Sequence, residues 1–171
     1  PEKILGAQYG RRLHFWDLHK RKHVQEIDFG DKYQLVFELR PAHDPTKAYG
    51  FVNCVLSLED LSSSIWTWYR DGDKWAVKKV ITIPAEPAAA DQLPPLLQGF
   101  KAVPPLVTDI DLSVDDKYLY VSCWGTGEFL HGPWLPGLPT HEEWGALLLV
   151  GNNPLVSING GLGVNPARNL R

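Results

Sequence analysis

The sequence contains no methionine and only two cysteines among its 171 residues. Because it opens on Pro1 without an initiator methionine, we expect it to be an internal piece of a longer protein. Cys54 and Cys123 each follow an alternating apolar stretch, which favours two buried strand residues over a disulfide or redox pair. Neither has a Cys or His close by at the spacing of a zinc knuckle.

A basic excess and a long apolar run are also missing. The net charge of -3 argues against nucleic acid as a partner. No apolar run approaches the roughly 20 residues that a membrane-spanning helix needs. We therefore expect no membrane span. The expected location is the cytoplasm, or the periplasm if the source is bacterial.

One sequence pattern occurs twice, in residues 34–57 and again in residues 106–123. Each copy has an apolar strand, a polar turn and a second strand that ends in cysteine, with an acid at the same place, Glu38 or Asp109. Repeated β-rich units of this spacing are typical of propellers, in which each blade is a small antiparallel sheet. The predicted fold is therefore all-β, a partial β-propeller with an irregular C-terminal tail.

Alternating apolar residues predict the strands of this propeller. The turn at residues 71–73 predicts a hairpin, because Gly72 supplies a positive φ without steric cost. Counted in blades, the chain should hold the outer half of one, all of a second and the inner half of a third. The predicted strands are residues 12–17, 24–29, 34–40, 50–58, 64–69, 75–83, 107–113 and 118–123.

Two segments depart from the repeat. Residues 84–105 are rich in Pro and Ala, and we interpret them as an insertion between blades, with a helix near residues 88–98 cut by Pro94-Pro95. The repeat is expected to stop at Glu128, which divides the chain into a propeller segment, 1–128, and an unmatched tail, 129–171. Within the tail only residues 146–150 and 155–158 are candidate strands.

The innermost strand of each blade lines the channel of a propeller, and here these should be residues 34–40 and 107–113. Glu38 and Asp109 would then point to the same side of neighbouring blades. They could hydrogen-bond the residues that hold a metal ion. The alternative is that they pair with arginine or backbone N–H groups at the blade junction.

His43 follows the first of these strands, in Arg40-Pro-Ala-His-Asp44. Imidazole can bind a metal ion, which makes His43 a candidate metal ligand. The alternative is a turn histidine hydrogen-bonded to Asp44.

The other histidines and the tryptophans have simpler interpretations. We expect His14 to be a packing or surface residue, and His19 and His23 to lie on a solvated basic edge. His131 and His141 fall in the expected tail. The aromatic residues around the predicted hairpin should pack across strands rather than stack on a ligand. They are Trp66, Trp68, Tyr69 and Trp75.

Five long stretches, in order over about residues 9–128, closely resemble the selenium-binding protein family, also called methanethiol oxidases. The resemblance implies a seven-bladed propeller of which this chain is a middle segment. It also implies oxidation of methanethiol by O₂ to formaldehyde, hydrogen sulfide and hydrogen peroxide, with copper as cofactor, and binding of selenium. The five stretches are residues 39–52, 60–66, 83–87, 103–110 and 118–124.

The resemblance places the cysteine motifs linked to selenium outside this chain, together with several histidines. No catalytic residue is therefore assigned, and the segment alone is expected to be inactive. The expected partners are a small thiol and selenium. The alternative function is a non-enzymatic propeller that binds selenium, soft metals or proteins, with residues 84–105 on its rim.

Overall fold

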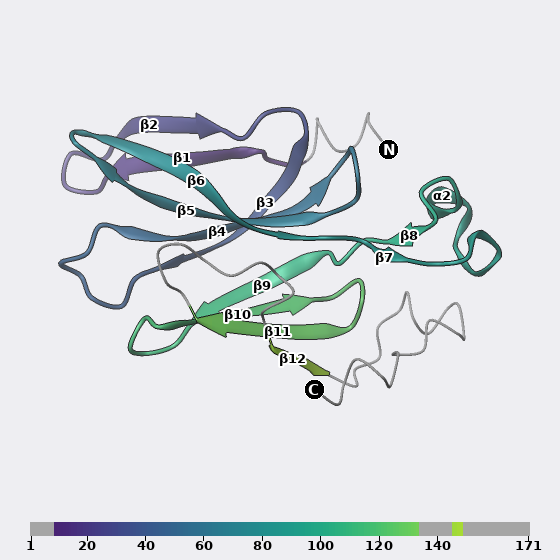
Figure 1. Ribbon diagram of the computed structural model, residues 1–171. Helices are drawn as coiled ribbons and strands as arrows, with labels where there is room; N and C mark the ends of the chain where they lie inside the picture. The colour runs from purple at the N-terminus through teal and green to yellow at the C-terminus, as the bar shows by residue number, and fades with distance from the viewer. Residues whose placement is uncertain (1–8, 134–144, 149–171) are drawn as a thin grey trace.

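The computed structural model describes residues 9–133 and 145–148, which are mostly antiparallel β-sheet (Figure 1). Apart from a short ladder in the insertion, three sheets follow one another along the chain, and their strands as far as residue 123 confirm those predicted from the alternating pattern. The first contains β1 (Arg12–Asp17) and β2 (Lys22–Asp28). The second has the order β3 (Tyr33–Pro41), β4 (Tyr49–Ser57), β5 (Ser63–Asp71) and β6 (Lys74–Ile83). The third has the order β12 (Gly145–Leu148), β11 (Glu128–Pro133), β10 (Tyr118–Cys123) and β9 (Val107–Leu112).

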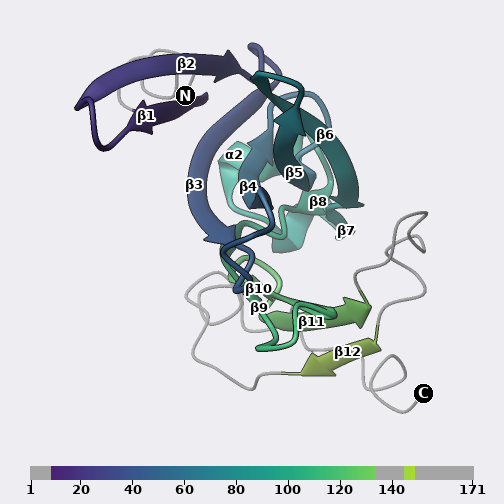
Figure 2. The ribbon, with the colours of Figure 1, turned by 90° about the vertical axis from the view of Figure 1, so that its left-hand side faces the viewer.

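The sheets are stacked with the second one in the middle (Figure 2). Successive residues of β4 point to opposite faces, as the strand geometry requires. Phe51 enters an apolar cluster shared with the third sheet, whereas Val52 and Cys54 enter a cluster shared with the first. The middle sheet is thus buried on both faces, and this partial propeller-like, all-β arrangement confirms the predicted fold class.

The two copies of the sequence repeat have the same backbone conformation. Leu35 and Leu106, at matching positions, both have a positive φ, 63° and 48°. Val36 lies opposite Cys54, and Val107 lies opposite Cys123, with a bulge beside each pair. Both cysteines are free and buried, as predicted.

The strand pattern does not stop at Glu128, so that prediction is wrong. β11 begins there and pairs with β10, and β12 pairs with β11, so the third sheet has four strands rather than two. Gly127, with φ 74°, turns the chain back, and Leu130 is buried in the core. The strand ends at Pro133, which has no N–H to donate to a ladder.

Beyond β11, the first candidate strand of the tail is present as far as Leu148, and residues 155–158 lie outside the described residues. The division of the chain into residues 1–128 and 129–171 stays a prediction.

The insertion at residues 84–105 projects from the stacked sheets (Figure 1). A short ladder of β7 (Glu86–Pro87) and β8 (Ala102–Val103) closes its base. Its tip has a 3₁₀ turn, η1 (Ala90–Gln92), and a single helical turn, α2 (Pro95–Gln98). Pro94-Pro95 starts this turn instead of cutting a helix, because proline is preorganised for the first helical position. No helix in the described ranges is long and apolar enough to cross a membrane.

The aromatic residues of the β5–β6 hairpin pack between the first two sheets. Trp68 and Trp75 are edge to face at 5.5 Å between centroids, and Phe15 of β1 stacks on Trp75 at 4.7 Å. Trp66 contacts Phe29 in the same way, edge to face. The structure therefore gives these rings packing partners, as the sequence predicts.

Candidate functional site

The candidate site lies where β3 meets β9. These are edge strands of the second and third sheets, the two strands predicted to line a channel, and they lie side by side. The loops that follow them, residues 42–48 and 113–117, project at the same end of the molecule (Figure 1). Polar side chains from both strands and both loops meet along this junction.

Asn53, which the sequence analysis missed, connects the two strands from inside the core. The bulge in β3 between Val36 and Leu39 interrupts the ladder around Glu38. The Glu38 N–H donates to Asn53 Oδ1 at 2.7 Å, and Asn53 Nδ2 donates to the Val107 carbonyl at 2.6 Å. Asn53 is fully buried. A lone Asn within the apolar run of β4 was the signal that could have revealed it.

Glu38 and Asp109 are brought together around the guanidinium of Arg40. The Arg40 Nη2 atom lies 2.5 Å from Glu38 Oε1 and 3.5 Å from Asp109 Oδ1, and its Nε donates to Asp111 Oδ1 at 3.3 Å. The Ile110 N–H donates to Glu38 Oε2 at 3.1 Å. Arginine and a backbone N–H are the partners expected if these acids pair at the blade junction. In the described part of the chain, these partners, and not His43, contact the two acids.

The sequence analysis missed Arg40 and Asp111 as members of this cluster. Both were visible as alternate positions, since Arg40 follows Glu38 by two residues and Asp111 follows Asp109 by two. Alternate residues share a face of a strand. What the sequence lacked was the pairing of β3 with β9 in space.

The electrostatics of the acidic cluster favour a cation. Burial, a hydrogen bond with Asp109 and repulsion by its charge raise the pKa of Glu38, while the Ile110 N–H and Arg40 oppose the rise. One guanidinium faces three carboxyl groups, so the cluster stays net negative when they are ionised. The side chains of Asp109 and Asp111 are the exposed members of this cluster.

His43 contacts the buried carboxylate of Asp116, from the loop after β9. The His43 N–H donates to Asp116 Oδ1 at 3.0 Å, and the ring Nδ1 lies 2.7 Å from the same oxygen. Asp44, the partner that the alternative interpretation expected, instead accepts hydrogen bonds from Thr46. The sequence alone could not reveal this partner, because Asp116 lies 73 residues from His43 and only the tertiary structure brings the two together.

The environment of Asp116 keeps it ionised. Burial by itself raises the pKa of this carboxyl group, but hydrogen bonds from the His43 backbone and ring and from the Asp44 N–H hold the pKa below its usual value. The carboxylate therefore holds Nδ1 of His43 and leaves Nε2 as the nitrogen for a ligand. The imidazole is 46% exposed.

His43 fits a metal centre as one imidazole ligand. Within residues 9–133 and 145–148 it belongs to no group of three or more potential metal ligands. A centre with three protein ligands would therefore need at least one ligand from residues other than those described.

A hollow of about 350 Å³ opens on the face of the third sheet that points away from the second. Tyr120 and Phe129 stack along it, at 5.9 Å between centroids. We assign it no ligand. Its lining consists of Asp109, Ile110, Asp111, Tyr120, Ser122 and Phe129.

The other histidines lie elsewhere. His14 and His23 come together on the β1–β2 hairpin, and His19 is exposed in its turn. The side chain of His131 and the whole of His141 lie outside the described residues.

Sequence comparison identifies relatives over most of the chain. Residues 1–131 match the family described as "56kDa selenium binding protein (SBP56)". A methanethiol oxidase of Xenopus laevis is 39% identical over 132 residues, one of Danio rerio 37% over 134, and one of Homo sapiens 36% over 133. Each alignment covers 77% of this chain and 24 to 25% of the relative, so the chain spans about a quarter of their length.

A solved structure is also similar. It is a hypothetical selenium-binding protein from Sulfolobus tokodaii, with a TM-score of 0.79 and 49% sequence identity. The match covers 88% of this chain and 33% of that one.

Proposed function

Because this chain belongs to the 56 kDa selenium-binding protein family, we propose that it forms part of a methanethiol oxidase. The reaction converts methanethiol, O₂ and water to formaldehyde, hydrogen sulfide and hydrogen peroxide. The observation that carries the proposal is His43, a half-exposed imidazole whose Nδ1 is fixed by a buried carboxylate. The choice of this reaction rests on the relatives named methanethiol oxidase.

His43 would hold copper through Nε2, with Asp116 fixing the ring. A carboxylate on the far nitrogen of a ligating histidine sets its tautomer and raises its basicity. Copper would supply one-electron chemistry and a soft acceptor for a thiolate. The role of the residues described here is to orient one ligand.

Glu38 and Asp109 would act through charge and position. The net negative cluster around Arg40 lies on the strand pair that leads into the loop of His43, and it would favour a cation at this end of the junction. Arg40 and the Ile110 N–H hold the Glu38 carboxylate in place, so its negative charge is preorganised.

Selenium would bind to cysteines outside this segment. Burial raises the pKa of Cys54 to about 12 and raises that of Cys123 as well, which keeps both as thiols rather than reactive thiolates. We also propose a cytoplasmic location, with which two reduced cysteines are compatible. Since the chain spans a quarter of its relatives' length, we expect the 171 residues alone to release no hydrogen peroxide from methanethiol.

A chimera tests the proposal. Residues 9–133 replace the aligned stretch of the Danio rerio methanethiol oxidase, and hydrogen peroxide release and copper content are measured. We expect the chimera to turn over methanethiol, and His43→Ala to lose both activity and copper. His19→Ala, an exposed histidine outside the junction, is the matched control and should keep both. A folded His43→Ala chimera with unchanged copper and turnover would disprove the assignment.

The alternative, a non-enzymatic binding module, rests on the insertion. Leu96 and Phe100 at its tip are 66% and 47% exposed, and the tip stands away from the sheets (Figure 1). A chimera that folds and loads copper without producing hydrogen peroxide, but binds a protein only with Leu96 and Phe100 intact, would favour this alternative.

A further inference from the structure

A separate group of potential metal ligands lies on the β1–β2 hairpin, and it includes His14 and His23, which the sequence analysis expected at packing, surface or solvated positions. His14 Nδ1 lies 3.2 Å from His23 Nε2 and 3.6 Å from Glu26 Oε2. The three donor atoms are all within 4.8 Å of one another. We propose that His14, His23 and Glu26 bind a divalent late transition metal ion, Cu²⁺ or Zn²⁺.

A β-bulge creates this group. His14 lies directly opposite Glu26, so these two side chains share a face of the hairpin. In a regular ladder Trp16 would face Val24, and His23 would point to the other face. The register shift between Phe15 and Trp16 instead sets His23 opposite Trp16, and so brings its ring to the face of His14.

The spacing of the donors fits a shared ion. Ligands at about 2.0–2.1 Å from a tetrahedral Zn²⁺ are separated by roughly 3.3 Å. The two measured separations from His14 Nδ1 lie close to this value. Two imidazoles and a carboxylate with further positions open to water suit Cu²⁺ and Zn²⁺ and disfavour Mg²⁺ and Ca²⁺, which prefer oxygen ligands.

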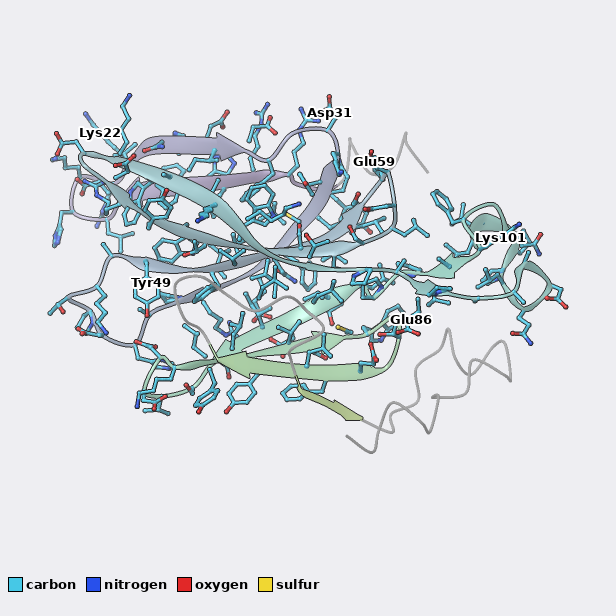
Figure 3. All side chains as sticks on the ribbon, in the orientation of Figure 1. Lys22, Asp31, Tyr49, Glu59, Glu86 and Lys101 are labelled. Carbon is cyan, nitrogen blue, oxygen red and sulfur yellow. The ribbon has the colours of Figure 1, made fainter. Side chains whose placement is uncertain are left out.

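The neighbouring charges leave the required atoms available. Arg12 contacts Glu26 through Oε1, at 3.4 Å, whereas Oε2 is the oxygen that faces His14. Arg12 also pairs with Asp28, which offsets its charge. Lys22, at the start of β2, points away from the sheets (Figure 3). The site is open, since the side chains of His14 and Glu26 are 46% and 42% exposed.

The test is titration of the full chain with Cu²⁺ or Zn²⁺ in a His43→Ala background, so that the candidate ligand at the β3–β9 junction contributes nothing. Calorimetry should give one equivalent of ion per chain. His23→Ala and His14→Ala should weaken binding at least about tenfold, since losing even an outer partner of a metal ligand costs 10–100-fold. His19→Ala, in the turn of the same hairpin, should bind as the background does, and Mg²⁺ should give no signal.

Fluorescence gives a second readout. The Trp16 ring lies 5.2 Å from that of His23, so bound Cu²⁺ should quench it. Trp16→Phe should remove that part of the quenching and leave the calorimetric affinity unchanged. The proposal is overturned if neither ion binds saturably, or if folded His23→Ala binds as tightly as His19→Ala. Circular dichroism identifies variants that fail to fold, for which His14→Gln and Glu26→Gln serve instead.

Discussion

Asp116 is the residue that couples two loops at the candidate site. It is an acid in the left-handed region, with φ 59°, and it is buried. Its carboxylate accepts hydrogen bonds from the backbone and ring of His43. A single side chain thus positions the candidate ligand and joins the ends of β3 and β9.

Asp116→Asn should therefore lower the free energy of unfolding by roughly 1–2 kcal/mol at neutral pH, because it removes the charge from these hydrogen bonds. The folded-state pKa of Asp116 lies below its ordinary 3.8, so its contribution is present above that value and is lost as the pH falls through the lowered pKa. Urea unfolding at several pH values should show the two proteins converging in acid. A constant difference down to the lowest pH would contradict this.

The cysteines allow a prediction about reactivity. Cys54 and Cys123 are buried thiols with raised pKa values, so a thiol reagent should not label the native chain. In denaturant, both should react, which gives two labelled thiols per chain. Rapid labelling of either in the native state would show that the strands around it open.

At the scale of the element, β4 is constrained by what faces each of its residues. Gly50 faces the Trp68 ring and the Arg40 carbonyl so closely that an added Cβ would overlap both. This close approach brings β3, which carries Arg40, and β5, which carries Trp68, onto β4. Glycine is needed here for space rather than for a positive φ.

Gly50→Ala should accordingly destabilise the chain by about 1–3 kcal/mol, the usual cost of overpacking. Gly99 is the matched control, because it ends α2 with φ -66° and has open space around its Cβ position. Gly99→Ala should change the stability by less than about 0.5 kcal/mol. Thermal unfolding measures both, and equal stabilities would show that β4 can shift to admit the methyl group.

At the scale of the whole molecule, stability depends on how the sheets are joined. Apolar clusters fill both faces of the middle sheet. Two polar connections add specificity: Asn53 between β3 and β9, and Gln25, whose side-chain amide donates to and accepts from the backbone of Trp75. Each of these side-chain amides forms hydrogen bonds with backbone groups of a strand at the edge of a sheet.

Asn53→Val should cost about 1–3 kcal/mol, since it leaves the Glu38 N–H and the Val107 carbonyl buried without their partner. Thr108→Val, a half-buried change in the adjoining strand, should cost less. Urea unfolding followed by fluorescence provides the comparison. A smaller loss for Asn53→Val than for Thr108→Val would mean that water replaces the amide.

The sequence by itself determined the strands as far as Cys123, the equivalence of the two repeats and the family. Alternation of apolar residues is a local property, and the matching positions of Cys54 and Cys123 follow from it. It also placed Glu38 and Asp109 at equivalent positions.

The tertiary structure alone decided which side chains contact one another between strands and between sheets. Asp116 displaced Asp44 as the partner of His43, and Arg40 entered the acidic cluster, because contacts between sheets join residues about seventy positions apart. The bulge that turns His23 toward His14 depends on the register of two strands, and register is set by pairing in space rather than by the residues of either strand.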